Sequence, residues 1–120
     1  MAKSTYRGTN TYNSIYSKLV ETAKNKSTIS YVDLALAARL PARGEYMAET
    51  LSAVLREIAL ECINKEQPVL PALVLKGGDD LPGNGFFVMM GELLGRSFAE
   101  TEDRYSYWEA TTQSIYSYWK

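Results

Sequence analysis

The sequence predicts an α+β fold: a mainly helical single domain, residues 1–120, with a small β-hairpin. Three observations support this class. The chain has 120 residues, which is enough for one hydrophobic core but too few for two domains. Apolar residues recur every three or four positions in three long stretches, as they do on one face of a helix. A short apolar run and a glycine-rich turn separate the second stretch from the third, as a strand and a hairpin would.

Two stretches carry the clearest helical pattern, residues 11–26 and residues 45–65. The core-facing positions of the first are Tyr12, Ile15, Tyr16, Leu19 and Ala23. Those of the second are Met47, Leu51, Val54, Leu55, Ile58 and Cys62. Because the second pattern extends over about five turns, it predicts the longest helix of the chain, with its cysteine on the buried face.

A shorter helix is expected between these two, within residues 27–44. A β-branched stretch around Ile29 leads to Ser30, whose hydroxyl suits a helix N-cap. Asp33 follows three residues later, in the manner of a capping box. The helix should therefore begin at this serine and end before Pro41.

Residues 69–75, after Pro68, predict a buried strand, because the run is short, apolar and bounded by turn residues. The glycine-rich stretch LVLKGGDDLPGNGFF then predicts a turn, and Phe86 and Phe87 are expected to begin the returning strand of a hairpin. The chain should continue as a buried helix to Gly95, since glycine suits a left-handed helix cap.

This order of elements resembles the helix-turn-helix and wing of alkylguanine alkyltransferases and of the alkyltransferase-like proteins. The matching stretches are STISYVDLALAARL, MAETLSAVLREI and PVLPALVLKGGDDLPGNGFF. The resemblance implies a winged-helix-like centre and a DNA ligand. It does not imply alkyl transfer, because that family's Pro-Cys-His-Arg motif is replaced here by Pro-Val-Leu-Pro, residues 68–71. The chain also resembles small uncharacterised bacterial and phage proteins, which implies a phage or mobile-element origin.

Composition excludes several chemistries. Histidine is absent and Cys62 is the single cysteine, so no internal disulfide, His-based triad or usual zinc site can form. No apolar run approaches the roughly 20 residues that cross a bilayer, and the first residues have no apolar signal segment. We expect a cytoplasmic protein that is not an enzyme, binds no metal or cofactor and has no membrane partner.

The glycine-rich stretch has three interpretations. A phosphate loop would place Gly-Lys-Ser/Thr before a helix, whereas Lys76 precedes the glycines and Asp79 and Asp80 would repel an anion. A metal-dependent enzyme would use the two aspartates as ligands, with Glu92 as a distant third ligand. We favour a hairpin or wing, in which both aspartates are solvated turn residues.

Charge is divided along the chain. Residues 1–43 carry seven basic and two acidic residues, whereas the remainder carries six basic and twelve acidic residues. The basic part predicts contacts to nucleic acid as one candidate function. The residues expected to make them are Lys24, Lys26, Arg39, Arg43 and Lys76.

Residues 105–120 predict a last helix rich in aromatic side chains. Its expected buried face consists of Tyr105, Trp108, Thr112, Ile115 and Trp119. The flanking Tyr107, Tyr116 and Tyr118 are candidates for a partner interface, because tyrosine is a preferred anchor of interfaces. The leading prediction is a non-enzymatic accessory or regulatory module that binds a protein partner or a second copy of itself. A winged-helix DNA-binding protein is the second prediction, and a metal-dependent enzyme the third.

The metal hypothesis is tested by thermal unfolding of the wild type and of the Asp79→Ala/Asp80→Ala double variant. A metal that bound only the folded chain would raise the melting temperature by mass action. We expect magnesium, calcium and manganese to cause no shift in either protein. A shift in the wild type that the double variant lacks would contradict the hairpin interpretation.

Overall fold

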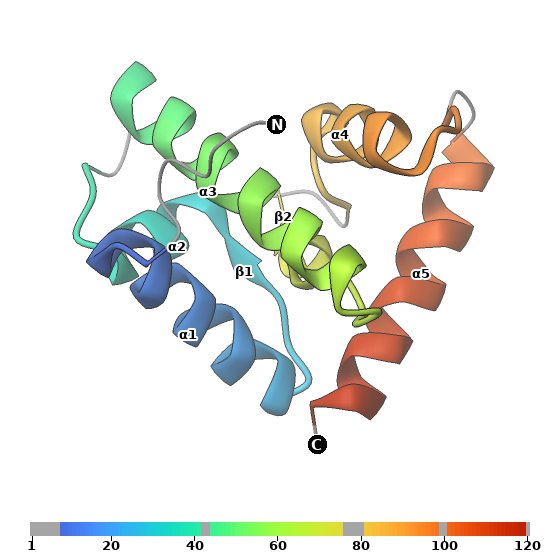
Figure 1. The fold of residues 1–120 in the computed structure, drawn as a ribbon, viewed down its shortest axis with the longest axis horizontal. Helices are drawn as coiled ribbons and strands as arrows, with labels where there is room; N and C mark the ends of the chain where they lie inside the picture. Colours follow the sequence, from blue (N-terminus) through green and yellow to red (C-terminus); the bar gives the residue numbers. More distant parts are fainter. Residues whose placement is uncertain (1–7, 42–43, 76–80, 99–100, 120) are drawn as a thin grey trace.

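The computed structural model describes residues 8–41, 44–75, 81–98 and 101–119, and helices dominate it (Figure 1). In chain order the elements are α1 (Asn10–Lys24), β1 (Ile29–Ser30), α2 (Tyr31–Ala37), α3 (Glu45–Asn64), the 3₁₀ helix η1 (Leu70–Leu73), β2 (Val74–Leu75), α4 (Asn84–Leu94) and α5 (Thr101–Tyr118). The predicted mainly helical α+β class is confirmed for the described residues.

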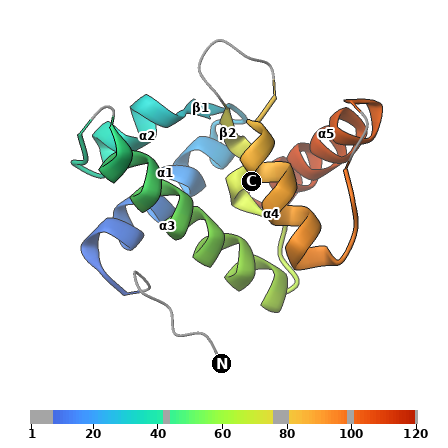
Figure 2. The same cartoon turned by 90° about the horizontal axis from the view of Figure 1, so that it is seen from above.

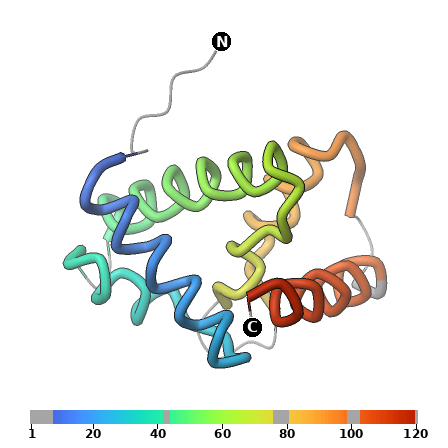
Figure 3. Tube along the Cα trace, turned by 60° about the horizontal axis from the view of Figure 1, so that its bottom comes forward, coloured from blue at the N-terminus to red at the C-terminus, as the bar shows by residue number. Residues whose placement is uncertain are grey.

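A buried segment, residues 69–74, lies at the centre of the fold. All six of its residues are buried, and α1, α3 and α5 pack around η1 within it. Figure 3 shows this segment in yellow between α3 and α5. The segment continues into β2, which lies beside β1 (Figure 2) and pairs with it in parallel, with Ile29 opposite Val74. Two stretches that are about 45 residues apart in sequence therefore meet in the core.

The predicted β-hairpin is wrong. Phe86 and Phe87 lie in the first turn of α4 and do not form a returning strand. The partner of β2 is instead β1, and the pairing is parallel. Parallel strands require a long crossover, which α2 and α3 supply here. The expected tip of the wing, residues 76–80, lies outside the described residues.

The predicted strand over residues 69–75 is largely a 3₁₀ helix. Residues 69–74 are buried as expected, but only Val74 and Leu75 form a strand. Pro71 stands at the start of η1, where its fixed φ and missing N–H suit a helical turn. A short apolar run has no periodicity that distinguishes a strand from a helical turn, so the sequence pattern could not settle this point.

The other predicted helices are confirmed, but the expected buried face of the last one is only partly right. Thr112 and Ile115 are buried and Trp108 and Trp119 are partly buried, whereas Tyr105 is 49% exposed. The expected core residues of α1 and α3 are buried apart from Tyr16 and Met47, which pack against the core while partly exposed. The Ser30 hydroxyl accepts a hydrogen bond from the backbone N–H of Asp33 at the start of α2. The last helix, α5, begins at Thr101, four residues before its expected start.

Four helices end in the same left-handed turn. After α4 the turn uses Gly95, as expected, with φ of 69°. After α1, α2 and α3 the equivalent residues are Lys26, Arg39 and Glu66, with φ between 53° and 61°. In each case the N–H of the following residue bonds to the carbonyl five residues back, which is the Schellman arrangement. Three of these turns therefore hold a residue with a Cβ in a conformation that favours glycine.

Side-chain hydrogen bonds tie α5 to the rest of the chain. The Nε1 of Trp108 donates to the carbonyl of Ala72 at 2.8 Å, and the hydroxyl of Tyr116 donates to the carbonyl of Ser27 at 3.0 Å. The first bond satisfies a backbone acceptor in the buried segment, which would otherwise be costly to leave unpaired. Among the described residues, no helix has the length and apolar character needed to cross a bilayer.

The left-handed turn after α3 predicts a stabilising substitution. Glu66→Gly should raise the free energy of unfolding by roughly 0.5–1 kcal/mol, because the strain of a Cβ at this φ exceeds the added freedom of glycine in the unfolded chain. Glu66→Ala is the matched control, since it removes the same charge and keeps the Cβ. Urea denaturation of the three proteins measures the effect. Equal stabilisation by both variants would show that charge, not backbone conformation, is responsible.

Candidate functional site

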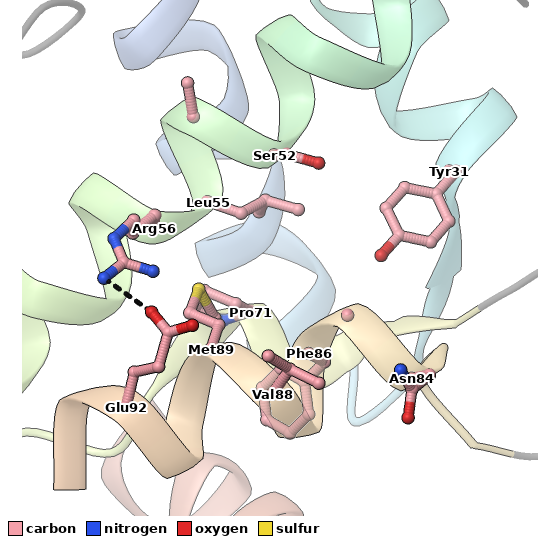
Figure 4. A pocket seen from close by; sticks show the side chains of 12 residues that line it. Tyr31, Ser52, Leu55, Arg56, Pro71, Asn84, Phe86, Val88, Met89 and Glu92 are labelled. Atoms are coloured by element: carbon pink, nitrogen blue, oxygen red, sulfur yellow. Dashed lines mark ion pairs between the residues drawn. The ribbon is translucent and has the colours of Figure 1, made fainter. Parts of the chain in front are cut away.

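A groove of about 590 Å³ lies between α3 and α4 (Figure 4). The two helices do not pack closely along their length, and their facing side chains line the space between them. Pro71 of η1 and Tyr31 of α2 complete the lining. The groove therefore combines residues from four elements around the central buried segment.

The floor of the groove is apolar and its wall is partly open to solvent. Leu55, Pro71 and Phe86 are buried beneath it. Val88 is 48% exposed, and Met89 beside it is partly buried. Water that contacts these apolar side chains would be displaced favourably by an apolar ligand. The groove is suited to an apolar group of a ligand.

An ion pair bridges the two walls. The Nη2 of Arg56 on α3 lies 3.1 Å from the Oε2 of Glu92 on α4 (Figure 4). Both side chains are about half exposed, so the pair contributes little to stability. It does place one charge of each sign beside the apolar floor.

Tyr31 contributes a polar group to the groove. Its ring points from α2 toward the groove in Figure 4. Burial raises the pKa of the Tyr31 hydroxyl above its usual value, so the hydroxyl is neutral near physiological pH and can donate a hydrogen bond.

The groove continues into an acidic strip on α3. Glu45 and Glu49 lie on the same helical face as Ser52, Ala53 and Arg56, because their spacings are three, four or seven residues. Both glutamates are exposed, and in the described part of the chain neither forms an ion pair. This strip places two exposed carboxylates on the face of α3 that leads to the groove.

The described basic residues predicted to contact nucleic acid do not gather on one surface. Lys24 ends α1 and Lys26 follows it, whereas Arg39 follows α2; all three are exposed. The C-terminal ends of α1 and α2 lie at opposite ends of this helix pair in Figures 1 and 3. Arg43 and Lys76 lie outside the described residues.

Two of the three candidate interface tyrosines take part in packing. The ring of Tyr107 lies 4.7 Å from that of Phe98, and burial raises the pKa of its hydroxyl. Tyr116 bonds to the carbonyl of Ser27. Tyr118 is half exposed and its ring touches Trp119. Of the three, Tyr118 presents the most accessible ring to a partner.

The residues proposed for a metal site are not brought together within the described chain. Asp79 and Asp80 lie outside the described residues, and the carboxylate of Glu92 is engaged by Arg56. Where the structure describes the chain, no group of three acidic or cysteine side chains could hold a metal ion.

Sequence reasoning missed the groove, although one signal pointed to it. The stretch GFFVMMGELLG is apolar nearly all round, so a helix formed by it exposes apolar residues unless it is buried on every side. In the structure Phe86, Phe87 and Met90 are buried and Val88 faces outward. The opposite wall on α3 could not be inferred, because nothing in the sequence shows which helix faces Val88.

Comparisons with protein-family models, with curated proteins and with solved structures find no match for this chain.

Cys62 is a buried structural thiol. Its side chain is 1% exposed, and burial is the main cause that raises the pKa of the thiol. The reactive thiolate is therefore scarce, and reagents cannot reach it in the folded chain.

We expect Cys62 to react with a thiol reagent such as DTNB only when the chain unfolds. The labelled fraction should rise with urea over the same range in which circular dichroism reports the loss of helix. Rapid stoichiometric labelling without urea would contradict the placement of this face of α3.

Proposed function

We propose that this chain is a non-enzymatic accessory or regulatory module whose α3–α4 groove binds a segment of a partner protein. The proposed segment has one large apolar side chain that enters the groove and a lysine or arginine beside it. The partly open apolar groove is the observation that carries the proposal. A cytoplasmic location belongs to the same proposal and is supported by the use of cysteine as a lone buried thiol.

The size and lining of the groove support an anchoring side chain. A volume of about 590 Å³ is within the range of pockets that bury most of a small ligand or side chain. Interfaces gain much of their affinity from a few large side chains that are fully desolvated in such pockets. Tyr31 and Asn84 supply polar groups beside the apolar floor that can fix the orientation of a bound segment.

Charge complementarity supports a basic segment. Glu45 and Glu49 extend the groove face and lack ion-pair partners in the described chain. A lysine or arginine in the bound segment would lie near these carboxylates. The same charges disfavour a nucleic acid on this face, because its phosphates would be repelled.

The groove is tested with a displayed library of random peptides. We expect the selected peptides to share a bulky apolar residue next to lysine or arginine. Val88→Lys should weaken the binding of a selected peptide by about tenfold or more, because it places a positive charge in the apolar wall. Val32→Lys is the matched control, since Val32 is 46% exposed and lies on α2 outside the groove lining.

Two outcomes would contradict the proposal. If the selected peptides bind the Val88→Lys and Val32→Lys proteins equally well, the groove is not their site. If sedimentation instead shows a dimer of the wild-type chain that Val88→Lys alone disrupts, a second copy occupies the groove.

The acidic strip generates a separate prediction. Glu49→Lys should weaken peptides that carry lysine or arginine and leave the affinity of their uncharged analogues nearly unchanged. Titration at low and high salt should show that this difference shrinks as salt rises, because exposed charges are screened. Equal loss of affinity for charged and uncharged peptides would show that Glu49→Lys perturbs the groove itself.

A further inference from the structure

A second hollow, of about 360 Å³, lies where α4 leads into α5. Two arginines line it, Arg96 just after α4 and Arg104 in the first turns of α5. Figure 1 shows this corner at the end of α4 farthest from β2. Neither arginine lines the groove between α3 and α4.

The backbone turn after α4 places Arg96 away from the position that it would have if the helix continued. Gly95 has φ of 69°, and the N–H of Arg96 returns to the carbonyl of Gly91. A Cβ on Gly91 would stand 2.6 Å from the carbonyl oxygen of Arg96, so only glycine allows this close return. A continued helix would have put Arg96 one turn beyond Glu92, where the two side chains could pair. Glu92 pairs instead with Arg56.

Aromatic rings hold both guanidinium groups in place. The Cζ of Arg96 lies 4.2 Å from the centre of the Phe98 ring, and the Cζ of Arg104 lies 5.1 Å from the centre of the Phe87 ring. The Nε of Arg104 also donates to the carbonyl of Phe98 at 2.6 Å. Stacking and this hydrogen bond restrict the two side chains, so less conformational entropy is lost when they bind a ligand.

Within the described part of the chain, neither Arg96 nor Arg104 forms an ion pair with a carboxylate. Glu92 also lines the hollow, but its carboxylate is engaged by Arg56. Asp103 precedes Arg104, is exposed, and forms no ion pair with it among the described residues. Two positive charges therefore face one hollow.

From this geometry we propose that the corner between α4 and α5 is an oxyanion-binding site. Arg96 and Arg104 donate charge-assisted hydrogen bonds to a phosphoryl or carboxylate group, which both guanidinium forks suit. The nitrogen atoms of Arg104 other than Nε remain for the ligand, because Nε is used by the chain. The site recognises an anionic group carried by a small molecule or by a protein segment.

The site is tested by NMR titration of the wild-type chain with inorganic phosphate and, separately, with acetate, at constant ionic strength. Phosphate is expected to shift the Nε–Hε signals of Arg96 and Arg104 and the amide signals of Gly91 and Ser97 with a saturable curve. Saturation by acetate at lower concentration than phosphate would identify a carboxylate as the preferred group. Sodium chloride, over the same range of ionic strength, should cause no saturable shift.

Variants decide whether the arginines form the site. Arg96→Gln should weaken phosphate binding by about tenfold or more, because a charge-assisted hydrogen bond is lost. Arg96→Lys should recover only part of the affinity, since lysine keeps the charge without the planar fork. Arg39→Gln removes an equivalent exposed charge at the end of α2 and should leave binding unchanged.

The Arg104→Gln variant also loses the hydrogen bond to the carbonyl of Phe98. The melting temperature of this variant is therefore measured before its affinity for phosphate. Arg96 makes no such bond and serves as the main variant. The absence of a saturable shift with both anions, or binding that survives Arg96→Gln, would overturn the proposal.

Discussion

Burial of residues 69–74 is the constraint on which the rest of the structure depends. This segment has no exposed face, so every element around it must turn apolar side chains toward it. Its backbone polar groups also need partners, and β1 and the indole of Trp108 supply two of them. The parallel pairing of β1 with β2 and the position of α5 both follow from satisfying this one segment.

The same segment explains why a groove opens between α3 and α4. Pro71 lies under both helices and forms part of the floor. α3 packs on η1, while α4 begins after β2 and directs Phe86, Phe87 and Met90 toward the core. On the outward side of α4, the Arg56–Glu92 ion pair connects the helix to α3. The groove lies between α3, which packs on η1, and the outward side chains of α4.

Backbone turns govern where charge is placed. Left-handed residues end α1, α2, α3 and α4, and each redirects the chain sharply. After α4 this turn separates Arg96 from Glu92, which frees the arginine to stack on Phe98 and leaves the glutamate to Arg56. The left-handed conformation of Gly95 thereby affects which charged side chains lie in the groove and which lie at the corner beside it.

Local features of the sequence determined much of the secondary structure. The stripes of α1 and α3, the Ser30 cap and the Gly95 turn were predictable, because each depends on residues within one or two helical turns. Tertiary structure alone decided that residues 70–73 form a 3₁₀ helix and that β2 pairs with β1 rather than with Phe86 and Phe87. It also decided that Val88 faces α3 and that Arg96 and Arg104 share a hollow. These features join residues that are distant in sequence. A short apolar or charged stretch does not show which other segment of the chain it will pack against.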